Sequence, residues 1–240
     1  MRNIFRIVGV LLSIFLILSC KKEEDSSSEI IFNPNLDYDT VTDFDGTVYK
    51  TITIGTQTWM AENLRTTKYR NGDLIGTTTP ATLNISGEIT PKYQWAYDGN
   101  ESKVAIYGRL YTWYALADSR NLCPTGWHVP NDEEWTTLTE YLGGENVAGG
   151  KLKEISSAHW HRPNQGATNE SGFTALPGGG RNQYGLFRYI GESGDWWSST
   201  EHYLDTICAN EVNLYYDSGS LISAFYSVKK NTNSVRCIKN

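Results

Sequence analysis

Residues 123–142, CPTGWHVPNDEEWTTLTEYL, carry the clearest structural signal in the chain. Asn131 can cap a helix, and Glu134 follows three residues later, which is the spacing of a capping box. The apolar residues that would share one face of this helix are Trp135, Leu138, Tyr141 and Leu142. A Gly-Gly pair ends the pattern. The stretch therefore predicts a helix from about Asp132 to Leu142, reached from a Pro-Gly turn that holds a cysteine.

The rest of the domain has the composition of a β-rich protein. Its 8 Trp, 15 Tyr and 22 Gly, with only 20% charged residues, are typical of short strands joined by tight turns. Alternating patterns predict an antiparallel, meander-like second half over residues 184–190, 195–200, 205–215, 219–228 and 233–239. A strand is predicted over 43–55, and weaker helices are predicted over 110–117 and 148–155. The predicted fold class is α+β, with short antiparallel strands, one or two principal helices and long ordered loops.

The N-terminus has the pattern of a lipoprotein signal peptide. Arg2 and Arg6 precede an apolar run over residues 7–18, which is too short to span ~30 Å of hydrocarbon. Residues 16–20, LILSC, resemble a lipobox, so we expect cleavage before Cys20 and acylation of that cysteine, with palmitate among the expected acyl groups. The predicted organisation is a signal peptide over 1–19, a lipidated cysteine with a flexible tether over 20–40, and one domain over 41–240.

The residues after Cys20 bear on where the domain is displayed. Two lysines are followed by three acids, which resembles the surface-export signal of Bacteroidota lipoproteins, although a charged spacer would have the same composition. We therefore expect an outer-membrane lipoprotein whose domain faces either outward or into the periplasm. The formal net charge of −6 gives no support to nucleic acid as a partner.

Three cysteines remain if Cys20 carries lipid, so one of them must be unpaired. Cys123 lies in a turn and Cys237 in a predicted final strand, and we favour a disulfide between them in an oxidising compartment. Cys208, flanked by Ile207 and Ala209, would then be a buried thiol. Pairing of Cys208 with Cys237 is the alternative.

Motifs spread over about 195 residues resemble one known family. They are Ile54 to Leu64 (IGTQTWMAENL), Tyr107 to Tyr111 (YGRLY), Cys123 to Pro130 with Glu134 and Trp135, Ser171 to Phe173, Leu176 to Gly179, Trp196 to Thr200 (WWSST), and Ser234 to Cys237 (SVRC). On these residues the chain resembles the Fibrobacter succinogenes major paralogous domain of exported bacterial proteins. That family is similar to the C-type lectin-like fold and to formylglycine-generating enzymes, which implies a lectin-like domain here but no catalytic residues.

Several residue groups are candidates for binding. Trp196, Trp197 and Glu201 could form an aromatic platform for a sugar ring, although adjacent strand residues face opposite sides and burial of both tryptophans is the alternative. Asn210, Glu211, Asn213 and Asp217 offer oxygen ligands for calcium, or else a solvated edge. His159 and His161 would share one side of a strand, but no third zinc ligand lies nearby in the sequence.

No catalytic constellation stands out. A formylglycine-generating activity would need two reactive cysteines for copper, and Cys208 would be alone. The sequence favours a non-enzymatic, lipid-anchored module that binds a glycan or a surface protein. Apart from calcium, we expect no cofactor. An extracellular polysaccharide-acting enzyme that uses two carboxylates as acid and base is the alternative.

Overall fold

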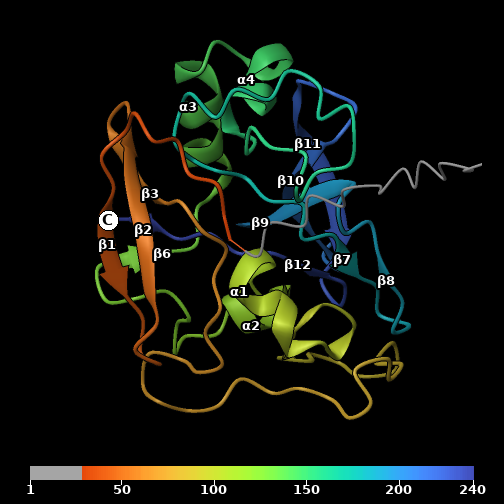
Figure 1. Cartoon of the computed structure of the whole chain (residues 1–240). Helices are drawn as coiled ribbons and strands as arrows, with labels where there is room; N and C mark the ends of the chain where they lie inside the picture. The colour runs from red at the N-terminus through yellow and green to blue at the C-terminus, as the bar shows by residue number, and fades with distance from the viewer. Residues whose placement is uncertain (1–28) are drawn as a thin grey trace, which may run out of the picture.

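The computed structural model describes residues 29–240, and it contains three antiparallel sheets (Figure 1). The first has the order β1 (Asp39–Thr42), β2 (Val48–Ile54), β3 (Gln57–Met60), β13 (Ile238–Lys239) and β6 (Trp127–His128). The second has the order β4 (Gln94–Trp95), β5 (Leu110–Thr112), β12 (Thr232–Asn233), β7 (Gly180–Arg181) and β8 (Phe187–Arg188). The third is a meander of β9 (Ser193–Glu201), β10 (Cys208–Tyr215) and β11 (Leu221–Val228).

The helices are short, and in the sequence they lie between strands of the sheets. They are α1 (Val104–Tyr107), α2 (Trp113–Leu116), α3 (Asp132–Tyr141) and α4 (Glu145–Leu152), with two 3-10 turns over Tyr97–Gly99 and Glu101–Lys103. The capping box of α3 is confirmed, because the Asn131 side chain accepts from the Glu134 N–H at 3.0 Å and the Glu134 carboxylate accepts from the Asn131 N–H at 2.8 Å. In Figure 1, α3 and α4 lie at one end of the sheets and α1 and α2 at the other.

The predicted α+β class is wrong. Even the longest helix, α3, has only ten residues, and the architecture rests on antiparallel sheets that form half-barrels. The helix predicted over 110–117 shows why. Leu110 to Thr112 pair with β4 and β12 as strand β5, and only Trp113–Leu116 are helical. Sheet pairing from distant parts of the chain has overridden a local helical spacing.

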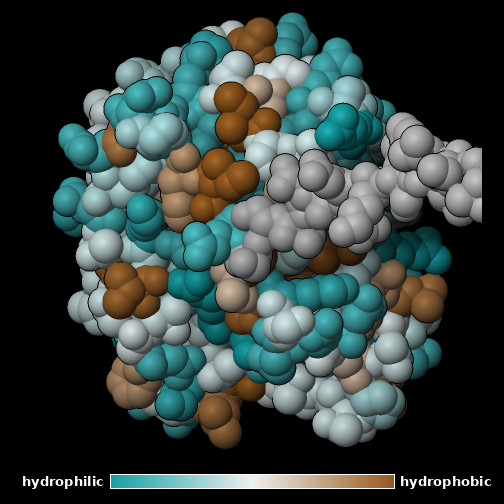
Figure 2. Space-filling view, viewed as in Figure 1, coloured by the Kyte–Doolittle hydropathy of each residue, from teal (hydrophilic) through white to brown (hydrophobic). Residues whose placement is uncertain are grey.

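Two apolar clusters form the core on either side of the first sheet. One includes Met60, Tyr111 and Trp197, and the other includes Trp59, Trp135 and Trp196 beneath α3 and α4. On the face shown in Figure 2, apolar side chains stand in small groups among polar ones. Within residues 29–240, no helix is long and apolar enough to cross a membrane.

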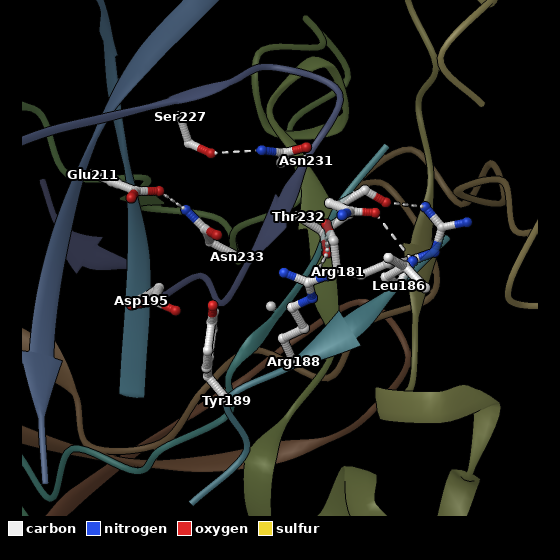
Figure 3. A pocket seen from close by; sticks show the side chains of 12 residues that line it. Arg181, Leu186, Arg188, Tyr189, Asp195, Glu211, Ser227, Asn231, Thr232 and Asn233 are labelled. Carbon is white, nitrogen blue, oxygen red and sulfur yellow. Dashed lines mark hydrogen bonds between the residues drawn. The ribbon is translucent and has the colours of Figure 1, made fainter. Parts of the chain in front are cut away.

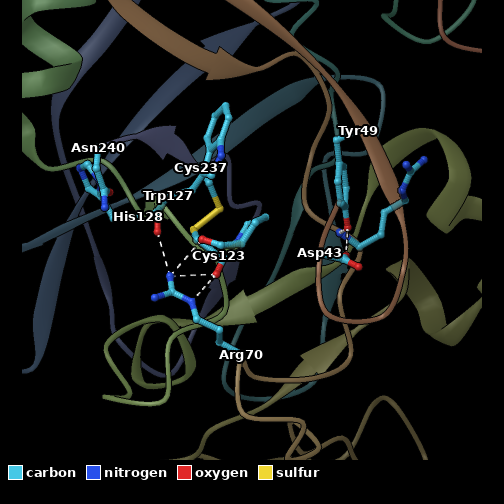
Figure 4. Close-up of a disulfide and its surroundings, with 10 residues drawn as sticks. Asp43, Tyr49, Arg70, Cys123, Trp127, His128, Cys237 and Asn240 are labelled. Atoms are coloured by element: carbon cyan, nitrogen blue, oxygen red, sulfur yellow. Dashed lines mark hydrogen bonds between the residues drawn. A yellow bond between two sulfur atoms is a disulfide. The ribbon is translucent and has the colours of Figure 1, made fainter. Parts of the chain in front are cut away.

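The disulfide between Cys123 and Cys237 is confirmed (Figure 4). Cys208 is a buried free thiol. The bond joins the turn before β6 to the residue before β13, so it fixes two strands that pair with each other. Arg70 braces the same turn by donating to the carbonyl oxygens of Cys123 and Pro124 and, at 2.9 Å, to that of Trp127.

The tether predicted over residues 20–40 extends too far at its C-terminal end. Phe32, Leu36 and Tyr38 pack against the core, and the backbone N–H of Ile31 donates to the buried Glu154 carboxylate at 2.7 Å. These large apolar side chains find partners on the domain, so residues 31–38 are part of the folded unit. The predicted signal peptide, Cys20 and the lysine-acid run after it lie outside the described residues.

Candidate functional site

A pocket of about 160 Å³, lined mostly by residues with polar side chains, lies between the β7–β8 hairpin and the β9–β11 meander (Figure 3). The meander supplies Asp195, Glu211 and Ser227 to its wall, and the hairpin supplies Arg188 and Tyr189. The remaining lining residues are Gly180, Arg181, Asn182, Leu186, Asn231, Thr232 and Asn233. The pocket thus combines two acids, two arginines, several side-chain amides and one aromatic ring.

The two acids share a face of the meander because of its register. Asn213 pairs with Asp195, and Glu211 stands two residues before Asn213 on β10. The Asn213 side-chain N–H donates to Asp195 at 2.8 Å and to Glu211 at 3.3 Å, which joins the carboxylates through one amide. Ser193 donates to the second Asp195 oxygen at 2.8 Å, and Asn233 donates to the second Glu211 oxygen.

Within residues 29–240, Asp195 and Glu211 form no ion pair with any Lys, Arg or His. Burial, and then the nearby Asp195 charge, raise the pKa of Glu211 to about 7. Burial also raises the pKa of Asp195. Both groups therefore hold protons more tightly in the folded protein than in the unfolded chain.

This arrangement predicts a pH-dependent stability difference. Folded Glu211 binds a proton more tightly than an unfolded glutamate, whose pKa is ~4.3, so the free energy of unfolding falls as pH rises from about 4.5 to about 7. The Glu211 contribution is up to about 3 kcal/mol. Glu211→Gln should remove that part of the slope, measured as the difference between the two proteins in urea unfolding at each pH. Parallel slopes would contradict the assignment.

Tyr189 forms the rim of the pocket and is held there by its backbone. Its φ is 69°, which is uncommon for a non-glycine residue, and its carbonyl oxygen accepts from the backbone N–H groups of Glu192 and Ser193 at 2.9 Å each. Its side chain is 55% exposed. Gly179 makes this path possible, because a Cβ there would lie 2.3 Å from the carbonyl oxygen of Arg188. An aromatic ring is thus kept in solvent beside the acids.

Arg181 supports the wall of the pocket through buried hydrogen bonds. Its guanidinium is buried and donates to the carbonyl oxygens of Ala81 at 2.9 Å, Asn182 at 3.0 Å and Leu83. It also lies 4.2 Å from the centre of the Trp95 ring. Burial lowers its pKa to about 10. Its donors hold the long loop before β4 against β7, so Arg181 supports the pocket and leaves Arg188 as the exposed cation on the wall.

The aromatic platform predicted from Trp196 and Trp197 is wrong. Both side chains are buried, one in each core cluster, and their indole N–H groups donate to Asn63 at 2.9 Å and to the Tyr111 carbonyl oxygen at 2.7 Å. Glu201 lies at the far end of β9 and pairs with Lys229 at 2.9 Å. The two tryptophans do face opposite sides of β9, as expected for adjacent strand residues, but both sides of the strand are buried at these positions.

The four predicted calcium ligands are not brought together. Glu211 and Asn213 share the pocket face, whereas Asn210 points to the other face and donates to Asp132 at 2.6 Å. Asp217 is exposed in the turn after β10. Among the described residues, no group of three His, Cys, Asp or Glu side chains could hold a metal ion.

The predicted histidine pair is also divided. His159 is buried and bonds the Glu154 carboxylate at 2.8 Å, while His161 is exposed and lies 3.9 Å from Glu192. The residues that the sequence did not single out are Asp195, Tyr189 and Asn233. Alternation along residues 195–200 would have placed Asp195 and Trp197 on one face, but it could not show that an open pocket lies there.

Together the fold and the site define a disulfide-closed β domain with a polar, acid-containing pocket. The chain belongs to the family described as the Fibrobacter succinogenes major domain, whose model matches residues 52–239. The resemblance in the sequence is thereby confirmed, and the family is one of surface and cell-envelope proteins. The lectin-like relation is not confirmed. No curated protein matches the chain, and no solved structure does.

Proposed function

We propose that the protein is a cell-envelope binding module that holds a sugar unit of a glycan in the pocket between the β7–β8 hairpin and the meander. The observation that carries the proposal is an exposed aromatic ring, Tyr189, beside two partly satisfied carboxylates. Sugars offer hydroxyl groups to planar polar side chains and an apolar ring face to an aromatic side chain. Acylation of Cys20 would hold the module at the outer membrane, as the sequence predicts.

The size and lining of the pocket fit this class of ligand. Pockets for drug-sized ligands measure ~300–1,000 Å³, so a cavity of about 160 Å³ suits one sugar unit better than a long chain. Asp195 and Glu211 can accept from hydroxyl groups, and the side-chain amides of Asn182 and Asn231 can both donate and accept. The rest of a glycan would extend past the exposed Tyr189.

The same geometry favours binding over glycoside hydrolysis. A hydrolase needs its two carboxyl groups on opposite sides of the scissile bond, ~5 to 9.5 Å apart. Here the Asn213 amide lies between Asp195 and Glu211 and donates to both, so the space that a glycosidic bond would need is filled by protein. The two acids therefore act as one acceptor surface.

The prediction for Tyr189→Ala is a loss of glycan binding by at least tenfold, because the stacking surface is removed while the acids remain. Tyr184→Ala is the matched control, since Tyr184 lies on the same hairpin and is 57% exposed but does not line the pocket. The measurement is binding of the wild type and both variants to a microarray of neutral, acidic and amino-bearing oligosaccharides. Absence of wild-type binding, or equal losses in both variants, would contradict the proposal.

A further inference from the structure

The acids of the pocket differ from three of the four other buried acids in the described part of the chain, Asp43 being the exception because it also accepts only from neutral donors. Asp118 pairs with Lys92 at 2.7 Å and Arg120 at 2.8 Å, Glu62 pairs with Arg65 at 3.2 Å, and Glu154 pairs with His159 at 2.8 Å. Asp195 and Glu211 line one cavity, and the donors that bond them are the neutral side chains of Ser193, Asn213 and Asn233. Two adjacent carboxylates without a counter-charge are costly to keep in a protein.

The neutral donors leave part of the acceptor capacity unused. Each of the four carboxylate oxygens receives one hydrogen bond from Asn213, Ser193 or Asn233, and an ionised carboxylate has about four acceptor sites. Both acids line the cavity, and Figure 3 shows their side chains on the meander side of it. A donor that enters the cavity can therefore reach acceptors that the protein itself does not fill.

We propose that the sugar unit held in this pocket carries a free amino group, whose ammonium binds Asp195 and Glu211 from the cavity side. This inference rests on the proposed glycan-binding function and narrows its ligand class. An ammonium has three donors and matches two carboxylates better than a hydroxyl group, which has one. The Tyr189 ring beside it favours a cation as well as an apolar sugar face.

The pKa values in the pocket follow from two acids that are buried side by side. Glu211 has a pKa near 7 because it is buried beside Asp195, and the phenol of Tyr215 has its pKa raised to about 12, first by burial and then by the same two acids. A bound ammonium would lower the pKa of Glu211 by favouring the carboxylate. Arg188 lines the pocket from the hairpin but forms no ion pair with either acid in the described part of the chain.

The test uses three trisaccharides that differ only in the substituent at carbon 2 of each sugar ring. They are cellotriose with a hydroxyl group, tri-N-acetylchitotriose with an acetamide, and fully deacetylated chitotriose with an amine. We expect the amine to bind the purified protein at least tenfold more tightly than either neutral sugar, by calorimetry at low ionic strength. Asp195→Asn and Glu211→Gln should each reduce binding of the amine by at least tenfold and should weaken binding of the neutral sugars by less, because a hydroxyl group loses one hydrogen-bond acceptor and no ion pair.

The outcomes separate this inference from the proposed function. Equal or tighter binding of the neutral trisaccharides would overturn the amino-group inference while supporting a glycan-binding pocket. No binding of the amine at millimolar concentration would also overturn it, and the microarray with Tyr189→Ala then decides the broader function on its own. Amine binding that both acid variants retain would show that the charge contact lies elsewhere, which again overturns the inference.

Discussion

Replacing Arg236 by methionine is expected to unfold the domain or lower its free energy of unfolding by about 4 kcal/mol or more, because several buried acceptors lose their donors together. The Arg236 guanidinium is fully buried and donates to the Asn63 side chain at 2.9 Å. It also donates to three carbonyl oxygens, those of Met60 at 3.4 Å, Phe173, and Thr174 at 2.7 Å. Methionine fills much of the volume but donates nothing. The Asn63 oxygen keeps the Trp196 donor, so the cost comes from the three carbonyl oxygens, at about 1–3 kcal/mol each.

Two further variants separate charge, shape and hydrogen bonding at this position. Arg236→Lys keeps the positive charge but not the planar fork, so we expect it to be less stable than the wild type and more stable than Arg236→Met. Arg162→Met is the matched control, since Arg162 is exposed, and its effect should stay within about 0.5 kcal/mol. The measurement is urea unfolding followed by tryptophan fluorescence. A change of under 1 kcal/mol for Arg236→Met would show that its donors are dispensable.

The contacts of Arg236 also show which parts of the fold can be predicted from the sequence. The capping box of α3 and the β9–β11 meander depend on neighbours in sequence, and both were predicted from residues close together. Arg236 receives its partners from residues 60–63 and 173–174, more than sixty positions away. Pairing with strands distant in sequence is also the reason that residues 110–112 form a strand and not part of the predicted helix. Local periodicity carries no information about such pairing, so the fold class was wrong although several elements were right.

The candidate site failed to emerge from the sequence for a related physical reason. Trp196 and Trp197 are adjacent and conspicuous, and both are used in the core. Asp195, one position earlier, faces a cavity because the β7–β8 hairpin stands off from the meander at that point. Whether one face of a strand is buried depends on the packing of another sheet against it, which the sequence of the strand does not show. Glu211 and Asn213 were singled out as oxygen ligands and do lie at or beside the pocket, but strand alternation removed Asn210 from the set.

The disulfide is the second feature with a large expected effect on stability. Cys123 and Cys237 are separated by 114 residues, and their bond closes a loop that contains most of the domain. In the chain-entropy model a loop of this length contributes about 4 to 5 kcal/mol by restricting the unfolded chain. The strands on either side are short: β13 and β6 have two residues each, so few ladder hydrogen bonds would hold the C-terminus without the covalent link.

The double variant Cys123→Ala with Cys237→Ala is therefore expected to lose about 4 kcal/mol of unfolding free energy, and the reduced wild type should match it. Alanine avoids placing a hydroxyl group in the core, where both sulfur atoms are buried.

Arg70 should keep the 123–127 turn in place, because its bonds to the Cys123 and Trp127 carbonyl oxygens do not depend on the sulfur. The loss should therefore appear first as opening of the C-terminal strand, seen as faster amide exchange at Ile238. Cys208→Ala, which removes a buried free thiol, is the control and should cost far less. Equal stability of the oxidised and reduced wild type would show that packing around β13 alone closes the domain.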